Sequence, residues 1–195
     1  PFKQCGKIIV AAKESQREIV AGYQAQAVRN GVEDLYWIDR EELKELEPEV
    51  VGIGAVVSPS TGIIDSHAYM LSLQGVMEKH GGMLALNTKA VAVESGKSSA
   101  HQRCIVRTDG FDLASQWVIN CAGLSAPSLA ADTPGGPKAY YAKGHYYAYS
   151  GRQPFSRLVY PTAEAGGLGV HVTLDLAGQV KFGPDVQWID EIDYS

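Results

Sequence analysis

Apolar positions along the first part of the chain recur at helical spacing in two long segments. Residues 14–30 carry the apolar series Ile19, Val20, Tyr23, Ala27 and Val28, and Gly31 supplies a helix stop. Ser66 opens the second segment, which His80-Gly81-Gly82 terminates. The spacing of its apolar residues predicts one inner face, made of Tyr69, Met70, Leu73, Val76 and Met77.

A short helix and several strands account for the rest. Asp39-Arg40-Glu41-Glu42 has the spacing of a capping box and predicts a helix that ends at Pro48. Short apolar or β-branched runs predict strands. These runs lie at residues 5–11, 50–57, 83–86, 90–94, 104–108, 117–121, 139–149, 158–160, 170–174 and 179–182. Helices come first and a long β-rich stretch follows, so the expected fold class is α+β with a large mixed sheet.

Composition removes several classes of function. The 195 residues include 17 Lys and Arg against 22 Asp and Glu, a formal charge of −5 that argues against nucleic acid as a partner. No apolar run approaches the ~20 residues of a transmembrane helix, and the first residues do not resemble a signal peptide. We therefore expect a cytoplasmic protein. Both ends resemble cuts through a longer protein, so we expect a fragment.

The sequence patterns of common catalytic and metal sites are missing. The sequence has no G-x-G-x-x-G, no Walker phosphate loop, no H-E-x-x-H and no C-x-x-C. Its five histidines lack metal-ligand spacing, and the three scattered cysteines form neither a disulfide framework nor a zinc site. No metal is expected.

Three segments are chemically informative, and each has a plainer alternative. In residues 117–124 an apolar run meets Ala122-Gly123, which suits close backbone approach to a ligand or a simple strand-turn-helix junction. Tyr160 and the glycines before His171 indicate a backbone pressed against a flat group, or a hairpin with a half-exposed histidine. Lys143-Gly144-His145 pairs a cation with a histidine, or forms a solvated strand edge.

At these residues the chain resembles the D-amino-acid-oxidase-like superfamily of FAD-dependent enzymes, and most of all its L-2-hydroxyglutarate dehydrogenase/oxidase branch. The matching motifs include Ser58-Pro59-Ser60-Thr61-Gly62 and Gly167-Leu168-Gly169-Val170-His171-Val172-Thr173. Further matching segments lie at residues 4–11, 46–48, 63–65, 118–124, 143–147 and 182–185. Their order spans nearly the whole chain.

The resemblance implies a mixed or antiparallel substrate-domain sheet with helices, plus an inner piece of a Rossmann-type FAD-binding domain. Residues 1–82 and 133–195 would belong to the substrate domain, and residues 83–132 to the FAD domain. The amino-terminal strand-glycine-helix that holds the FAD pyrophosphate in such proteins is missing from this sequence, as is the carboxy-terminal flavin-ring segment. We therefore expect that this chain alone does not retain FAD and is inactive.

The resemblance also assigns roles to single residues. His171 would be the catalytic base, and Lys143 and Tyr160 would contact substrate carboxylates and form the site wall. Residues expected to approach FAD are Val91, Ala122, Gly123, Leu124 and Gly169. The implied reaction is oxidation of a 2-hydroxy acid, in which the hydride passes from C2 to the flavin and the protein removes the hydroxyl proton.

Other functions remain open at this point. Within the superfamily, the alternative is an oxidase of glycine, sarcosine or another amino acid. From a different class, the chain could be a non-catalytic α+β binding module. A nicotinamide dehydrogenase is disfavoured, because the sequence has no dinucleotide fingerprint. The partner is a small-molecule substrate in the enzyme interpretations, and the electron acceptor is left open.

Overall fold

The computed structural model describes residues 1–96, 103–130, 135–136, 138–163 and 169–195. Two compact units make up the chain: Pro1–Gln74 with Ala142–Ser195, and Gly75–Tyr141. The described residues combine helices with mixed and antiparallel sheets, which confirms the α+β class expected from the sequence. Residues 83–132, expected to be the FAD-domain piece, fall in the second unit; their function stays a prediction.

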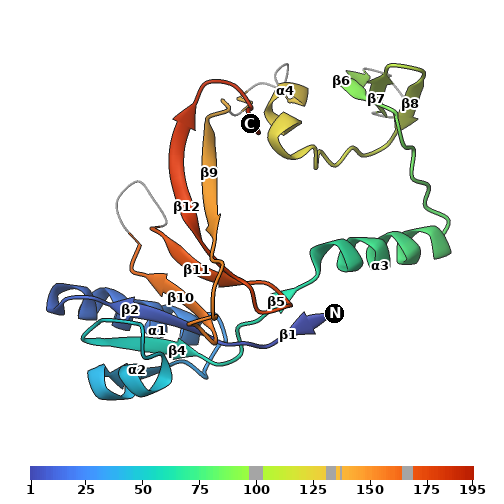
Figure 1. Ribbon diagram of the computed structural model, residues 1–195. Coiled ribbons are helices and arrows are strands. Elements are labelled where there is room, and N and C mark those ends of the chain that lie inside the picture. The colour runs from blue at the N-terminus through green and yellow to red at the C-terminus, as the bar shows by residue number, and fades with distance from the viewer. Residues whose placement is uncertain (97–102, 131–134, 137, 164–168) are drawn as a thin grey trace. The chain divides into compact units, whose positions relative to one another are not determined.

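The described part of the first unit contains a seven-stranded sheet (Figure 1). Its strands, in spatial order, are β3 (Tyr36–Asp39), β4 (Gly54–Ser58), β2 (Lys7–Ala11), β10 (Leu158–Pro161), β11 (His171–Leu174), β12 (Val180–Ile189) and β9 (Tyr141–Ala148). β10 pairs with β2 in parallel, whereas β4 pairs with β2, and β11 with β12, in antiparallel orientation. The short strands β1 (Phe2–Lys3) and β5 (Ile63–Ile64) form a separate antiparallel pair.

Two helices cover opposite faces of this sheet near β2 and β4. Val20 of α1 (Arg17–Arg29), which follows the 3₁₀ turn η1 (Glu14–Gln16), packs with Ala11 and Val56. Leu43 of α2 (Arg40–Leu46) clusters instead with Ile8, Val10, Ala55 and Val57. Because side chains alternate along a strand, these sets lie on different faces. We call them the α1 face and the α2 face.

The helix boundaries follow from local chemistry. The Asp39 carboxylate accepts hydrogen bonds from the backbone N–H of Glu41 and Glu42, and the Glu42 carboxylate accepts one from the Asp39 N–H. This is the predicted capping box. After α1, Gly31 has a φ of +79°, a left-handed conformation that glycine adopts without steric cost.

A buried carboxylate joins the end of α2 to the segment before β10. Glu47 is 1 % exposed, and it accepts hydrogen bonds from the Ser156 N–H and hydroxyl. Arg157 Nη1 lies 3.4 Å from the same carboxylate and 3.1 Å from the carbonyl oxygen of Leu46. Glu47 therefore holds together two segments that are 109 residues apart in sequence.

The helix α3 (Ser66–Lys79) forms where it was predicted, but its predicted inner face is wrong. No residue of this helix is buried. Five apolar side chains were expected to face a core, but none of the described residues covers them. They are 37–55 % exposed: Tyr69, Met70, Leu73, Val76 and Met77.

The second unit contains a three-stranded antiparallel sheet in its described part, with the order β6 (Ala90–Gly96), β7 (Arg103–Thr108), β8 (Asp112–Ser115). Arg107 of β7 pairs with Glu94 and Asp112 across both neighbouring strands. The hydrogen bond from Arg107 lowers the pKa of the Glu94 carboxyl. The turn η2 (Gly123–Ser125) leads into the short helix α4 (Ala126–Leu129), as expected after the glycine turn.

Two predicted strands of the second unit are absent from the described structure: residues 83–86 and 117–121 are neither helix nor strand. Trp117 is 85 % exposed and Ile119 84 %. A strand needs a partner for its backbone groups, and no described strand pairs with either segment. Apolar and β-branched composition was therefore not sufficient to predict a strand in these two segments.

Candidate functional site

The strand register brings Tyr160 and His171 together on the α1 face. Tyr160 lies beside Ile9 of β2, and this register places it on the α1 face, although its ring also packs against the core cluster that contains Leu158. Val159 pairs with Val172 in the antiparallel pair of β10 and β11, so the next pair is Tyr160 and His171. His171 is in turn opposite Gly183 of β12. Residues 11 positions apart in sequence thus become neighbours in the sheet.

The two rings are stacked. Their centroids are 4.0 Å apart and their planes differ by 2°. On the same face, Nζ of Lys7 lies 5.3 Å from the centroid of the Tyr160 ring, within the range of a cation–π contact. Lys7, Tyr160 and His171 therefore form a continuous group across three adjacent strands.

Tyr160 is held in its neutral form over a wide pH range. Burial raises the pKa of its phenol above the ordinary value near 10, and the phenol of Tyr146 adds to the shift. At neutral pH Tyr160 is consequently a hydrogen-bond donor, and Tyr146 is close enough to act on it electrostatically.

Two glycines shape the backbone around this pair. Gly169 has a φ of +72°, and a Cβ there would lie 2.6 Å from Cγ of Pro161. Gly183 has a φ of +154°, and a Cβ there would lie 2.6 Å from Cδ1 of Tyr146. Neither position accepts a side chain without displacement of its neighbour. The preceding residues of the predicted glycine-rich motif, 166–168, lie outside the described residues.

Lys143 is not brought to Tyr160 and His171. Its Nζ lies 2.7 Å from Oδ2 of Asp193 and also donates to the carbonyl oxygen of Ser195. The interaction with Lys143 holds the pKa of the Asp193 carboxyl well below its usual range. The Lys143 ammonium is thus already engaged near the end of the chain.

Four of the predicted FAD-contacting residues lie in the second unit. The register of β6 against β7 shifts between Ala90 and Ala92, so Val91 is bulged, and β6 is the edge strand of its sheet. Among the described strands none pairs with its outer edge, so backbone groups there are open to a ligand. Gly123, between Ala122 and Leu124, has a φ of +57° and open space where a Cβ would stand. These features fit close approach by the adenosine part of FAD.

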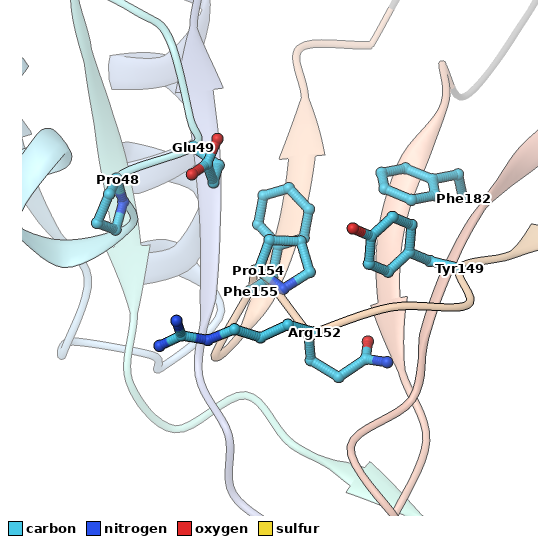
Figure 2. Close-up of a pocket in the computed structure, with 8 residues that line it drawn as sticks. Pro48, Glu49, Tyr149, Arg152, Pro154, Phe155 and Phe182 are labelled. Carbon is cyan, nitrogen blue, oxygen red and sulfur yellow. The ribbon is translucent and has the colours of Figure 1, made fainter.

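A separate cavity opens beside the α2 face (Figure 2). It has a volume of about 680 Å³, and none of the residues predicted as functional lines it. Tyr149 and Phe182 meet edge to face there, with centroids 6.4 Å apart, and Arg152 and Pro48 also line the cavity. The predicted chemistry in the first unit is therefore on the sheet face that carries Tyr160, not in this cavity.

Sequence reasoning missed two lysines of the α1 face. Lys7 pairs in register with Leu158, and Lys181 pairs with Thr173. One sheet row therefore reads Lys7, Leu158, Thr173, Lys181, next to the row that carries Tyr160 and His171. Nothing local in the sequence marks either lysine; only the strand order reveals them.

Other classes of site find no support in the described residues. Within that part of the chain, no group of three or more His, Cys, Asp and Glu side chains is arranged to hold a metal ion. Among the same residues, no helix is long and apolar enough to cross a membrane.

Comparison with known proteins identifies the family. Residues 1–194 match the DAO family, described as FAD dependent oxidoreductase. The chain belongs to this family. The mitochondrial L-2-hydroxyglutarate dehydrogenase of Arabidopsis thaliana is 35 % identical over 97 % of this chain and 46 % of that protein. The Escherichia coli O17:K52:H18 L-2-hydroxyglutarate dehydrogenase is 29 % identical over 94 % and 44 %.

Solved structures of flavoprotein oxidases share the fold of this chain. L-α-glycerophosphate oxidase from Mycoplasma pneumoniae, solved with FAD bound, gives a TM-score of 0.83 at 21 % identity, covering 98 % of this chain and 52 % of that one. Glycine oxidase from Geobacillus kaustophilus gives 0.75 at 18 %, covering 99 % and 51 %. The chain thus spans about half the length of the proteins it matches, and the resemblance expected from its motifs is confirmed at the level of the family.

Proposed function

We propose that the enzyme containing this chain oxidises a 2-hydroxy acid of the L-2-hydroxyglutarate type to the 2-oxo acid. The observation that carries the proposal is the Tyr160–His171 stack on an otherwise mixed apolar and cationic sheet face. The similarity to L-2-hydroxyglutarate dehydrogenases supports the substrate type. Membership of the DAO family supports FAD as the cofactor.

His171 is the proposed general base. A neutral imidazole has one ring nitrogen that can accept a proton. It would take the proton from the C2 hydroxyl of the substrate. FAD, when bound, supplies the hydride acceptor. A positioned base of this kind typically contributes about 10²–10⁴-fold to a rate.

Tyr160 is the proposed orienting group. Its ring fixes the plane of the imidazole by stacking, and its protonated phenol can donate a hydrogen bond to a substrate oxygen. Gly169 lets the chain turn tightly against Pro161 just before His171. These contacts together hold the base at a fixed place on the sheet.

The proposed FAD contacts of this chain are the open backbone of Val91 and the turn of Ala122, Gly123 and Leu124. They would meet the adenosine side of the cofactor. The sequence has no G-x-G-x-x-G turn to hold the pyrophosphate. We therefore propose that the chain by itself does not retain FAD. The cytoplasmic location also stays a prediction, since several relatives are described as mitochondrial.

Anaerobic mixing of the whole enzyme with candidate substrates tests this proposal. The oxidised enzyme should show flavin absorbance that bleaches on addition of L-2-hydroxyglutarate and not of glycine or sarcosine. Bleaching by the amines alone would replace the hydroxy-acid proposal with the amine-oxidase alternative. A protein that is colourless and takes up no added FAD would contradict the enzyme proposal altogether.

A further inference from the structure

The two lysines of the α1 face lie on either side of the Tyr160–His171 pair. Lys7 is on β2 and Lys181 on β12, whereas Tyr160 and His171 are on β10 and β11, the two strands between them. All four residues belong to two adjacent rows of one sheet face. A cation therefore stands at each end of the proposed catalytic pair.

The space between the lysines suits a ligand with two separated anionic groups. Three strand spacings of about 4.8 Å separate the Cα atoms of Lys7 and Lys181 by roughly 14 Å. The chain of a five-carbon dicarboxylate is about 5 Å long when extended, from its C–C bond lengths. With a C–O bond of about 1.25 Å and a hydrogen bond of about 2.8 Å at each end, the two ammonium groups would be roughly 13 Å apart. Two lysine side chains that extend nearly perpendicular to the sheet reach this separation.

Neither lysine is neutralised by a carboxylate within the described chain. Among its described residues, no ion pair includes Lys7 or Lys181. The row between them holds only Leu158, which is 5 % exposed, and Thr173, whose hydroxyl lies 3.4 Å from the Lys181 carbonyl oxygen. Both positive charges are thus available to an anionic ligand.

We propose that Lys7 and Lys181 bind the two carboxylates of the substrate and select dicarboxylic 2-hydroxy acids. The proposal rests on the proposed function, because it takes His171 as the base at C2. Lys181, on the adjoining strand β12, is opposite Thr173 and diagonal to His171, so it binds the C1 carboxylate beside the reacting carbon. Lys7 stands next to Tyr160 and binds the distal carboxylate. Lys7 is therefore the specificity determinant.

A comparison of two substrates in the whole enzyme tests this assignment. L-2-hydroxyglutarate has the distal carboxylate, and L-2-hydroxyvalerate has the same chain length without it. Lys7→Gln should lower kcat/KM for hydroxyglutarate by about 10- to 100-fold and leave that for hydroxyvalerate unchanged. Lys181→Gln should lower both by similar factors. Lys44→Gln, on α2 over the other face, is the matched control.

Equilibrium binding gives a readout that does not depend on turnover. In calorimetric titrations, glutarate should bind about 10-fold or more weakly to Lys7→Gln than to the wild type, and Lys7→Arg should restore much of the loss because it keeps the charge. Equal losses for both substrates in Lys7→Gln, or no loss in either lysine variant, would overturn the proposal while the hydroxy-acid function stands. Failure of the wild type to oxidise any 2-hydroxy acid would overturn both.

Discussion

The imidazole of His171 lies parallel to the phenol ring of Tyr160 at 4.0 Å, although the two residues come from different strands. Cross-strand neighbours are the units that stabilise a sheet, and an aromatic pair adds to this. Stacking fixes the plane of the imidazole, and its nitrogens exchange protons within that plane. The pairing of β10 with β11 thereby positions the imidazole beside Tyr160.

The burial of Tyr160 predicts that its phenol loses its proton at a higher pH than an ordinary tyrosine. Its pKa is raised by burial and by Tyr146, so absorbance at 295 nm should show one tyrosine that ionises above the ordinary value near 10. Because the folded-state pKa is raised, its contribution to stability is present below about pH 10 and is lost as the pH rises through the folded-state pKa. Tyr160→Phe should remove this component. An unchanged titration curve in that variant would contradict the assignment.

Glu47 should be essential for the stability of the first unit. Glu47→Gln removes the charge that Arg157 and Ser156 surround, so the free energy of unfolding should fall by about 2–4 kcal/mol in urea titrations. Glu49→Gln, at an exposed position two residues later, should change it by less than about 0.5 kcal/mol. Equal effects of the two variants would show that the buried network contributes nothing specific.

Alanine substitutions at two glycines distinguish the cost of backbone strain from the cost of a steric clash between side chains. Gly169 and Gly178 have φ values of +72° and +86°, but only Gly169 has a neighbour where a Cβ would stand. Gly178→Ala should cost about 1 kcal/mol of unfolding free energy from backbone strain alone. Gly169→Ala should cost more, because its Cβ would displace Pro161. A smaller loss for Gly169→Ala than for Gly178→Ala in the same thermal or urea unfolding series would be inconsistent with this contact.

Local signals in the sequence were enough for the helices. The capping box at Asp39 and the stop at Gly31 each depend on contacts within a few residues, and both form as predicted. Burial and strand pairing depend on distant segments. The apolar side of α3 is exposed, residues 117–121 form no strand, and β3 and β8 were not anticipated. Their formation depends on partners that no local window contains.

In the candidate site, too, features that depend on neighbouring residues could be predicted, and features that depend on distant strands could not. The glycines before His171 pointed to a special backbone position, and Gly169 has the left-handed conformation that such a position requires. Lys7 could not be found in this way, because its place beside Tyr160 results from a parallel pairing between residues about 150 positions apart. Lys143 had the more suggestive sequence context, yet its ammonium pairs with Asp193.

The central claim is that His171 removes the substrate proton, and rapid anaerobic mixing of the whole enzyme with L-2-hydroxyglutarate tests it most directly. His171→Asn should lower the rate constant of flavin reduction by about 10²–10⁴-fold, with glutarate affinity unchanged. His80→Asn, at the exposed position after α3, should leave the rate constant as in the wild type. A rate constant for His171→Asn equal to that of the wild type would contradict the account.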